Sequence, residues 1–245
     1  MYLCYMEKET GLFMLPVAIG EGNIERSLPK ENIEIAKRLS YFIVENVRTA
    51  RRCLKKMAPE IDISSLTFYE LNEHTPTNEI SGYLEPLRRG ESMGLMSEAG
   101  CPGVADPGAA VVKIAQREGL KIIPLVGPSS ILLSLMGSGL NGQLFTFNGY
   151  LPVDAHDREK RIRELEALSR KTGGTQIFIE TPYRNSKMLE SLLKALGGET
   201  LLCVAANITT VEEQIITRKV KEWRKLNIML EKVPTIFLFN SGENS

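Results

Sequence analysis

The sequence has little of what several common functional sites need. It has two histidines, His74 and His156, and neither lies in an HExxH motif or a Cys/His cluster, so no zinc site is expected. Its four cysteines are scattered without a CxxC pair, which predicts reduced thiols in a cytosol. No apolar run approaches the ~18 residues that a membrane span needs, and the charged N-terminus does not resemble a signal peptide.

The chain also lacks a charge of one sign. Lysine and arginine total 30, as do aspartate and glutamate, so any polyanionic partner must meet a local basic patch. Aromatic residues make up 7%, and none interleaves with the main basic cluster, so no platform for stacking single-stranded bases is indicated. What is present is ordinary globular composition, with 43% apolar residues in 245, enough for one large or two smaller α/β domains.

Strand-like and helical patterns alternate in the first half of the chain. This alternation predicts βαβ units and a mainly parallel sheet, with strands at 12–20, 40–45, 65–71, 92–97 and 120–127 and helices near 31–38, 46–57, 77–89 and 107–118. Later strand-like segments, several without long helices between them, predict a second, mixed sheet from 144–152, 175–181, 200–209, 213–220 and 234–242. We therefore predict two α/β domains, residues 1–127 and 128–245.

Two glycine-rich segments superficially resemble nucleotide-binding fingerprints. Residues 137–142, GSGLNG, follow a helical pattern and precede a strand, the reverse of a dinucleotide fingerprint, so we interpret them as a helix end and turn. Gly20-Glu21-Gly22 follows the first strand but lacks a third glycine. A simple turn and a ligand site both remain open there.

Residues 97–108, SEAGCPGVADPG, form with 126–130, VGPSS, a second kind of candidate. Both are glycine- and proline-rich junctions between a strand and a helix, where open parallel sheets bind ligands, although tight turns would look the same. Glu98 would repel a phosphate, whereas S-adenosylmethionine (SAM) carries positive charge and no phosphate. Asp106 and Pro107 predict the start of a helix that stops at Gly119.

The order of motifs across residues 12–240 resembles a known family. LPVAIG, VENVRTARR, LNEH, SEAGCPGVADPG, PLVGPSS, FNGYLP and IFIETPYR are similar to signatures of the tetrapyrrole methylase superfamily of class III SAM methyltransferases. Within it, the likeness is strongest to the small-subunit ribosomal RNA 2′-O-methyltransferase I group. The resemblance implies a cytoplasmic homodimer of two α/β domains, with SAM in a cleft between the domains of each chain.

Carried over by position, the resemblance implies mostly backbone contacts to SAM. We expect them from Pro16, Ile19, Gly20, Gly100, Cys101, Pro102, Val104, Gly127, Pro128, Ser129, Ser130, Phe178, Ile179, Ala205, Pro234 and Thr235. Small residues would let the main chain come close to the ligand.

The sequence departs from the family mainly outside these segments. Asn46 stands where the family has aspartate, residues 206–210 read ANITT instead of RELTK, and 232–234 read KVP instead of KGE. The segments expected to face the methyl acceptor are therefore less similar than those expected to face SAM.

Methyl transfer needs positioning and water exclusion more than a covalent residue or metal, but a hydroxyl acceptor benefits from a base. Of several acids at predicted strand ends, Glu45 and Glu73 match family motif positions, so we expect acceptor-side or base roles for them, with Arg48 beside them. Helix capping or ion pairing is the structural alternative.

The helix after Glu45 carries one basic face, which either binds RNA phosphates or is simply solvated. This face consists of Arg48, Arg51, Arg52, Lys55 and Lys56.

Three functional hypotheses follow from the sequence. The first is a SAM-dependent methyltransferase of RNA, by resemblance of ribosomal RNA. The second is a SAM-dependent methyltransferase of a small molecule such as a tetrapyrrole, or of a protein. The third is a SAM-binding module without catalysis, suggested by the altered segments at 206–210 and 232–234. A second basic cluster, Arg158, Lys160, Arg161 and Arg163, is interpreted as a solvated helix start.

Overall fold

The computed structural model describes residues 9–20, 24–72, 75–226, 228–230 and 232–242. The chain divides into two compact units, residues 1–129 and 130–245, and we describe each by itself. The boundary expected from the sequence lies at 127/128, beside this division.

The first unit is built on a five-stranded sheet in the order β3-β2-β4-β1-β5. All its described pairings are parallel, as the alternating pattern predicted. Its strands are β1 (Leu12–Met14), β2 (Tyr41–Val44), β3 (Thr67–Glu70), β4 (Met93–Met96) and β5 (Ile122–Pro124). Its helices are α2 (Ile24–Ser27), α3 (Lys30–Arg38), α4 (Val47–Met57), α5 (Thr77–Tyr83), α6 (Glu85–Arg88) and α7 (Gly108–Arg117), with a 3₁₀ turn η1 at Ile63–Ser65.

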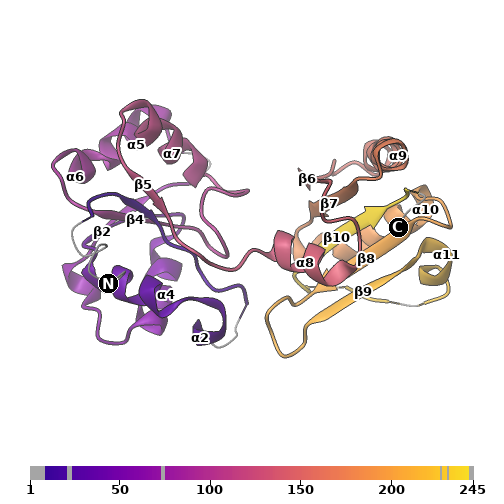
Figure 1. The fold of residues 1–245 in the computed structure, drawn as a ribbon, viewed down its shortest axis with the longest axis horizontal. Coiled ribbons are helices and arrows are strands. Elements are labelled where there is room, and N and C mark those ends of the chain that lie inside the picture. The colour runs from indigo at the N-terminus through magenta and orange to yellow at the C-terminus, as the bar shows by residue number, and fades with distance from the viewer. Residues whose placement is uncertain (1–8, 21–23, 73–74, 227, 231, 243–245) are drawn as a thin grey trace. The chain divides into compact units, whose positions relative to one another are not determined.

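Helices cover both faces of this sheet, which explains why its central strands are apolar throughout. Side chains of α2, α3 and α4 pack with Phe13, Phe42 and Val44 on one face. Side chains of α5, α6 and α7 pack with Ile43 and Leu95 on the other (Figure 1). The single helix predicted at 77–89 is broken at Leu84 into α5 and α6 because Pro86 has no N–H to continue the α5 ladder.

The second unit contains a mixed sheet, as predicted, and its strands lie in the order β6-β7-β10-β8-β9. Strands β6 and β7 pair parallel, and the other pairings are antiparallel. The strands are β6 (Phe145–Tyr150), β7 (Thr175–Ile179), β8 (Leu201–Ala206), β9 (Gln214–Lys219) and β10 (Thr235–Asn240). The helices are α8 (Ser130–Ser138), α9 (Ala155–Thr172), α10 (Asn185–Ala195) and α11 (Val220–Trp223), with a 3₁₀ turn η2 at Pro182–Arg184.

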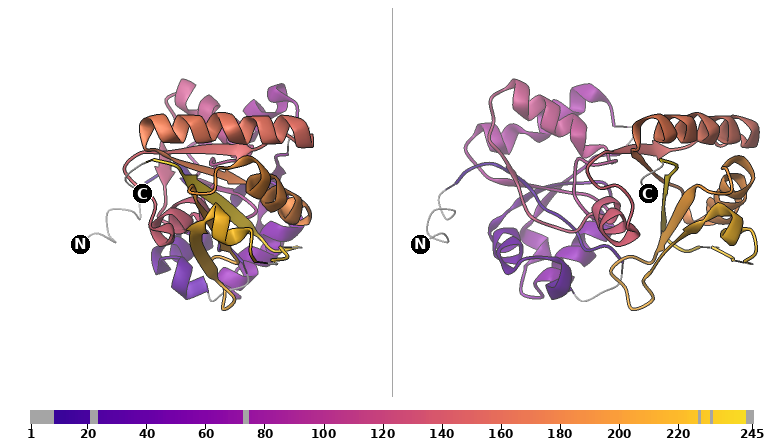
Figure 2. Two further views of the ribbon diagram at one scale, coloured as in Figure 1. Left: turned by 90° about the vertical axis from the view of Figure 1, so that its right-hand side faces the viewer. Right: turned by 45° about the vertical axis from the view of Figure 1, so that its right-hand side comes forward.

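The helices of this unit also lie on both faces of its sheet. Side chains of α9, α10 and α11 pack with Phe178 and Phe237 on one face, and α8 packs with Ile177 and Leu238 on the other. Figure 2 shows α9 as the long orange helix beside the sheet. The expectation of few long helices was therefore partly wrong, because α9 and α10 separate β6, β7 and β8. The many charged residues of α9 weakened its helical pattern.

Arg158 corrects a second expectation, because it is buried rather than solvated. Its Nε donates to Ser191 Oγ at 3.0 Å, and its Nη1 donates to the carbonyls of Val153 at 2.7 Å and Pro152 at 3.3 Å. The guanidinium thus fixes the loop before α9 onto α10. Lys160, Arg161 and Arg163 are exposed, as expected of a solvated face.

We expect Arg158→Met to lower the free energy of unfolding by about 2–3 kcal/mol, because three acceptors lose their donor. Chemical denaturation measures the change. The control Arg161→Met removes an exposed arginine whose described partner is Glu164, and should change stability by less than about 0.5 kcal/mol. Equal stability of the two variants would show that the buried guanidinium is dispensable.

Candidate functional site

Three loops meet at the carboxyl edge of the first sheet. Val17 and Gly100 exchange two backbone hydrogen bonds, each 2.9 Å long, so the chain after β1 is fixed to the loop after β4. The thiol of Cys101 donates to the carbonyl of Pro128 at 3.3 Å, which adds the loop after β5. The structure therefore brings together the predicted donor-site segments of this unit, 16–20, 97–108 and, from the segment 126–130, residues 126–129.

The loop at 97–108 is shaped by residues with left-handed backbone. Gly100 has φ +76° and Ala105 has φ +59°, a conformation that is costly for alanine. The Asp106 carboxylate accepts from the amides of Gly103 and Gly108, at 2.9 and 2.7 Å to Oδ1. Helix α7 begins one residue later than predicted, at Gly108, and Gly119 ends it with φ +67°, as predicted.

The packing of these loops places a constraint on Gly127 that is separate from its expected contact with SAM. A Cβ on Gly127 would lie 2.2 Å from Cβ of Pro16 and 2.5 Å from its Cγ. A side chain at this position is therefore excluded by the neighbouring loop itself, whatever ligand binds nearby. The contact of Gly127 with SAM stays a prediction.

The predicted donor-site residues of the first unit differ in exposure. Gly20 and Val104 are exposed, and Ile19, Cys101, Gly127 and Ser129 are half-buried. Those that are buried offer main-chain rather than side-chain groups: Pro16, Gly100, Pro102 and Pro128.

Acidic groups surround the loop at 97–108. Glu45, directly after β2, accepts a hydrogen bond from the amide of Glu98 at 3.0 Å. Burial raises the pKa of the Glu45 carboxyl above its ordinary value, the negative charges of Asp106 and Glu98 raise it further, and the Glu98 amide opposes them. Burial also raises the pKa of Asp106. These negative charges favour the binding of a cationic ligand and disfavour the binding of a phosphate.

The predicted donor-site residues of the second unit lie at one end of its sheet. In the β7–β10–β8 register, Ile236 is opposite both Ile179 and Ala205, and Thr235 is opposite Ala206. Ser130, another predicted donor-site residue of this unit, is the first residue of α8. Phe178 is fully buried and stacks on Phe237 at 5.8 Å between ring centroids, so its ring belongs to the core and only its main chain is available to a ligand.

The predicted basic face is present on α4. Arg48, Arg51, Arg52, Lys55 and Lys56 are exposed, and Ala50, Leu54 and Met57 are buried on the opposite side. The guanidinium of Arg51 lies 5.4 Å from the ring centroid of Phe68, and Lys55 Nζ donates to the carbonyl of Pro59 at 2.8 Å. Asn46 caps the helix by accepting from the amides of Arg48 and Thr49. Glu73 lies outside the described residues.

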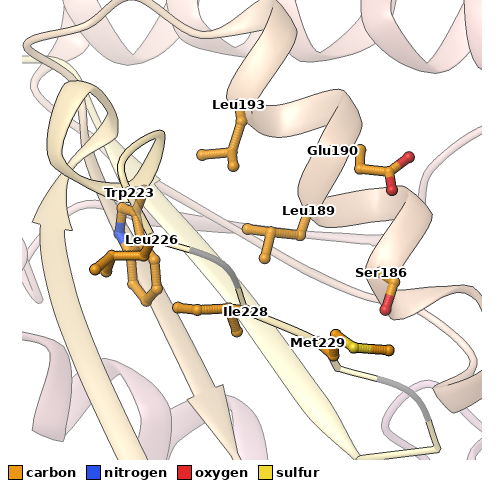
Figure 3. Close-up of a pocket in the computed structure, with 8 residues that line it drawn as sticks. All are labelled: Ser186, Leu189, Glu190, Leu193, Trp223, Leu226, Ile228 and Met229. Atoms are coloured by element: carbon orange, nitrogen blue, oxygen red, sulfur yellow. The ribbon is translucent and has the colours of Figure 1, made fainter.

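A pocket of about 300 Å³ lies elsewhere in the second unit (Figure 3). It contains none of the predicted site residues and is lined by Ser186, Leu189, Glu190, Leu193, Trp223, Leu226, Ile228 and Met229.

Within the described part of the chain, no group of three or more His, Cys, Asp or Glu side chains is placed to hold a metal ion. Among the described helices, none is both long and apolar enough to cross a bilayer.

Comparison with known proteins agrees with this geometry. Residues 17–223 match the family of tetrapyrrole (corrin/porphyrin) methylases. A ribosomal RNA small subunit methyltransferase I of Vibrio cholerae is 31% identical over 205 residues, covering 83% of this chain and 67% of that protein. The protein of the same name from Mesorhizobium japonicum is 35% identical over 146 residues, covering 60% of this chain and 48% of that one. The crystal structure of the methyltransferase CobJ superposes with a TM-score of 0.64 at 18% identity, covering 95% of both chains.

The parallel α/β unit followed by a mixed α/β unit is a fold shared with CobJ. The family match and the relatives define the chain as a SAM-dependent methyltransferase. The chain belongs to the tetrapyrrole methylase family.

Proposed function

We propose that this protein transfers the methyl group of SAM to a ribose 2′-hydroxyl of small-subunit ribosomal RNA. One observation in the first unit carries the proposal. The basic face of α4 begins just after Glu45, and the carboxylate of Glu45 is hydrogen-bonded to the amide of Glu98 in the loop proposed to bind SAM. An acceptor surface and a donor loop are thus joined through one side chain. The names of the relatives supply the class of acceptor.

The donor site fits SAM in its chemistry. When bound, SAM supplies a methyl group carried on a positively charged sulfur. The main chain of residues 16–20, 97–108 and 126–130 holds the ligand by shape and backbone hydrogen bonds, and the carboxylates of Glu45, Glu98 and Asp106 favour its positive charge. The resemblance also implies SAM contacts from the second unit, at the segments around 178–179, 205 and 234–235.

Glu45 is the proposed acceptor of the ribose hydroxyl proton. Its pKa is raised by burial and by neighbouring acids, which makes the carboxylate a better base than an ordinary glutamate. Its hydrogen bond from the Glu98 amide to Oε1 orients the carboxylate.

We expect Glu45→Gln to lower kcat roughly 100-fold while leaving SAM affinity close to that of the parent, because Gln keeps an oxygen for the Glu98 amide but loses the base. Rapid-quench methyl transfer measures kcat. The matched control Glu79→Gln changes an exposed acid of α5 and should be silent. A Glu45→Gln enzyme with parental kcat would assign Glu45 a purely structural role.

The same variant has a stability signature. A carboxyl whose folded pKa lies above its unfolded value destabilises the fold as pH rises from about 4.5 through the folded pKa. The glutamine does not titrate. The free energy of unfolding of Glu45→Gln should therefore equal or exceed that of the parent at pH 7, and the difference should shrink as pH falls toward 4.5.

Calorimetry with SAM and S-adenosylhomocysteine tests the donor half of the proposal. The parent should bind both, and absence of binding at millimolar ligand would overturn it. If the protein methylates a tetrapyrrole or another protein and not RNA, the SAM half of the proposal stands and the acceptor half is wrong. If it binds SAM but transfers no methyl group, it is a SAM-binding module without catalysis. The homodimer and cytoplasmic location implied by the family belong to the same proposal, and light scattering of the purified protein tests the dimer.

A further inference from the structure

The turn between β7 and α10 is built around an ion pair whose carboxylate is buried and whose guanidinium is partly exposed. The side chain of Glu180 is 1% exposed, and its Oε1 accepts from Arg184 Nη2 at 2.5 Å, from Arg184 Nε at 3.0 Å and from the amide of Thr181 at 2.6 Å. Three donors on one carboxylate oxygen close the 3₁₀ turn η2 tightly. The position of the next residue, Asn185, is set by this turn.

This turn holds the segment that leads into β10. The carbonyl of Pro182 accepts from the amide of Lys232 at 3.1 Å, and Asn185 Nδ2 donates to the carbonyl of Val233 at 2.5 Å. Lys232 has φ +61°, an unfavourable backbone conformation for lysine that the surrounding contacts must maintain. The next residues, Pro234 and Thr235, are two of the residues expected to contact SAM.

Asn185 is unusual because half of its carboxamide is unsatisfied. The residue is fully buried, and its Oδ1 accepts no hydrogen bond from any residue that the structure describes. Rotating the amide would place Oδ1 against the carbonyl of Val233, two acceptors facing each other, so the donor must point at Val233. A buried acceptor without a donor costs stability, so the fold gains little from choosing asparagine here. The carbonyl of Val233 also accepts from Thr235 Oγ1 at 2.9 Å, so it does not depend on Asn185 for a partner.

We propose that Asn185, held by the Glu180–Arg184 pair, is a positioning residue that sets the main chain of 233–235 for SAM. The inference rests on the proposed function. It goes beyond the predicted contacts because Asn185 is not among them: it acts through Val233 and is itself buried. Its function is to fix where the carbonyl of Val233 lies, and with it the main chain of Pro234 and Thr235.

The test is the affinity for S-adenosylhomocysteine of Asn185→Ala, measured by calorimetry. Alanine removes the bond to Val233 together with the unsatisfied oxygen, so the melting temperature should stay near that of the parent while the Kd rises roughly ten-fold. In turnover, the KM for SAM should rise while the affinity for RNA is unchanged. The matched control is Ser186→Ala, which removes only the acceptor for the amide of Leu230, further from Thr235, and should keep the parental Kd.

Asn185→Asp adds a readout that a purely structural residue would not move. An ionised aspartate cannot donate to Val233 and repels its carbonyl, whereas the protonated acid donates as the amide does. The ratio of variant to parental Kd should therefore be large at pH 8.5 and fall toward one as pH drops through the raised pKa of a buried acid.

Each outcome decides the inference. Parental Kd in Asn185→Ala, or a Kd ratio for Asn185→Asp that does not change with pH, overturns the positioning role and leaves the proposed function intact. A parent that does not bind S-adenosylhomocysteine overturns the proposed function and this inference with it.

Discussion

Replacing Gly127 by alanine is expected to weaken SAM binding about 100-fold or more. The new Cβ would lie 2.2 Å from Cβ of Pro16, far inside van der Waals contact. The loops at 16–20 and 126–130 must therefore move apart. Both loops belong to the proposed donor site. We expect their displacement to cost on the order of 100-fold in affinity, as a misplacement of about 1 Å does in rate at catalytic sites. Calorimetry with S-adenosylhomocysteine measures the loss.

Overpacking at this position also has a cost in stability of about 1–3 kcal/mol. Circular dichroism melts therefore accompany the binding measurement, so that unfolded protein is not counted as weak binding. Gly82→Ala is the matched control, because a Cβ there meets no atom within 4 Å and the residue lies in helix α5. If a folded Gly127→Ala protein binds as the parent does, the ligand does not lie against these loops.

Reversing charge on the outer face of α4 is expected to reduce RNA affinity about 100-fold at 0.1 M salt, with SAM affinity unchanged. The choice of residues follows from the structure. Arg51 packs over Phe68 and Lys55 bonds the carbonyl of Pro59, so changing them would also disturb the fold. Arg48 and Arg52 are exposed one turn apart, and glutamate at position 48, in the first turn of α4, is compatible with the helix dipole.

The double variant Arg48→Glu, Arg52→Glu should also flatten the salt dependence of binding. Each lost phosphate contact reduces the slope of log K against log salt by roughly 0.7–0.9. Filter binding from low to moderate salt measures both quantities. Lys160→Glu with Lys171→Glu makes the same change in net charge on α9 and should leave the slope unaltered. Equal losses in both double variants would indicate a general charge effect and no α4 binding face.

The sequence predicted the first unit well because its signals are local. Strands such as Tyr41–Val44 and Met93–Met96 are short apolar runs between turn residues, and the C-terminal glycine of α7 is in place. The second unit was harder. Helix α9 carries so many charged residues that its apolar side, Ile162 and Leu165, did not stand out. The burial of Arg158 depends on Ser191 in another helix and has no signal in its own segment.

The candidate site was predicted as a set of segments but without its internal contacts. The motif at 97–108 located the loop, yet the partners of Gly100 and Gly127 are Val17 and Pro16, residues about 80 and 110 positions away in sequence. Similarly, Glu45 was selected by position, while its bond to the Glu98 amide depends on the adjacency of β2 and β4. Asn185 was missed because its partner, Val233, lies 48 residues along the chain. Contacts made by folding over such separations have no local pattern.

The central claim is methyl transfer to small-subunit ribosomal RNA, and one measurement tests it most directly. Small ribosomal subunits from cells lacking this protein are incubated with the purified protein and SAM labelled in its methyl group, and the label is then mapped on the RNA. We expect label on a ribose 2′-oxygen of the small-subunit RNA, and much less label with Gly127→Ala at the same SAM concentration. Label that appears only in protein or in small molecules, with none on RNA, would contradict the proposed acceptor.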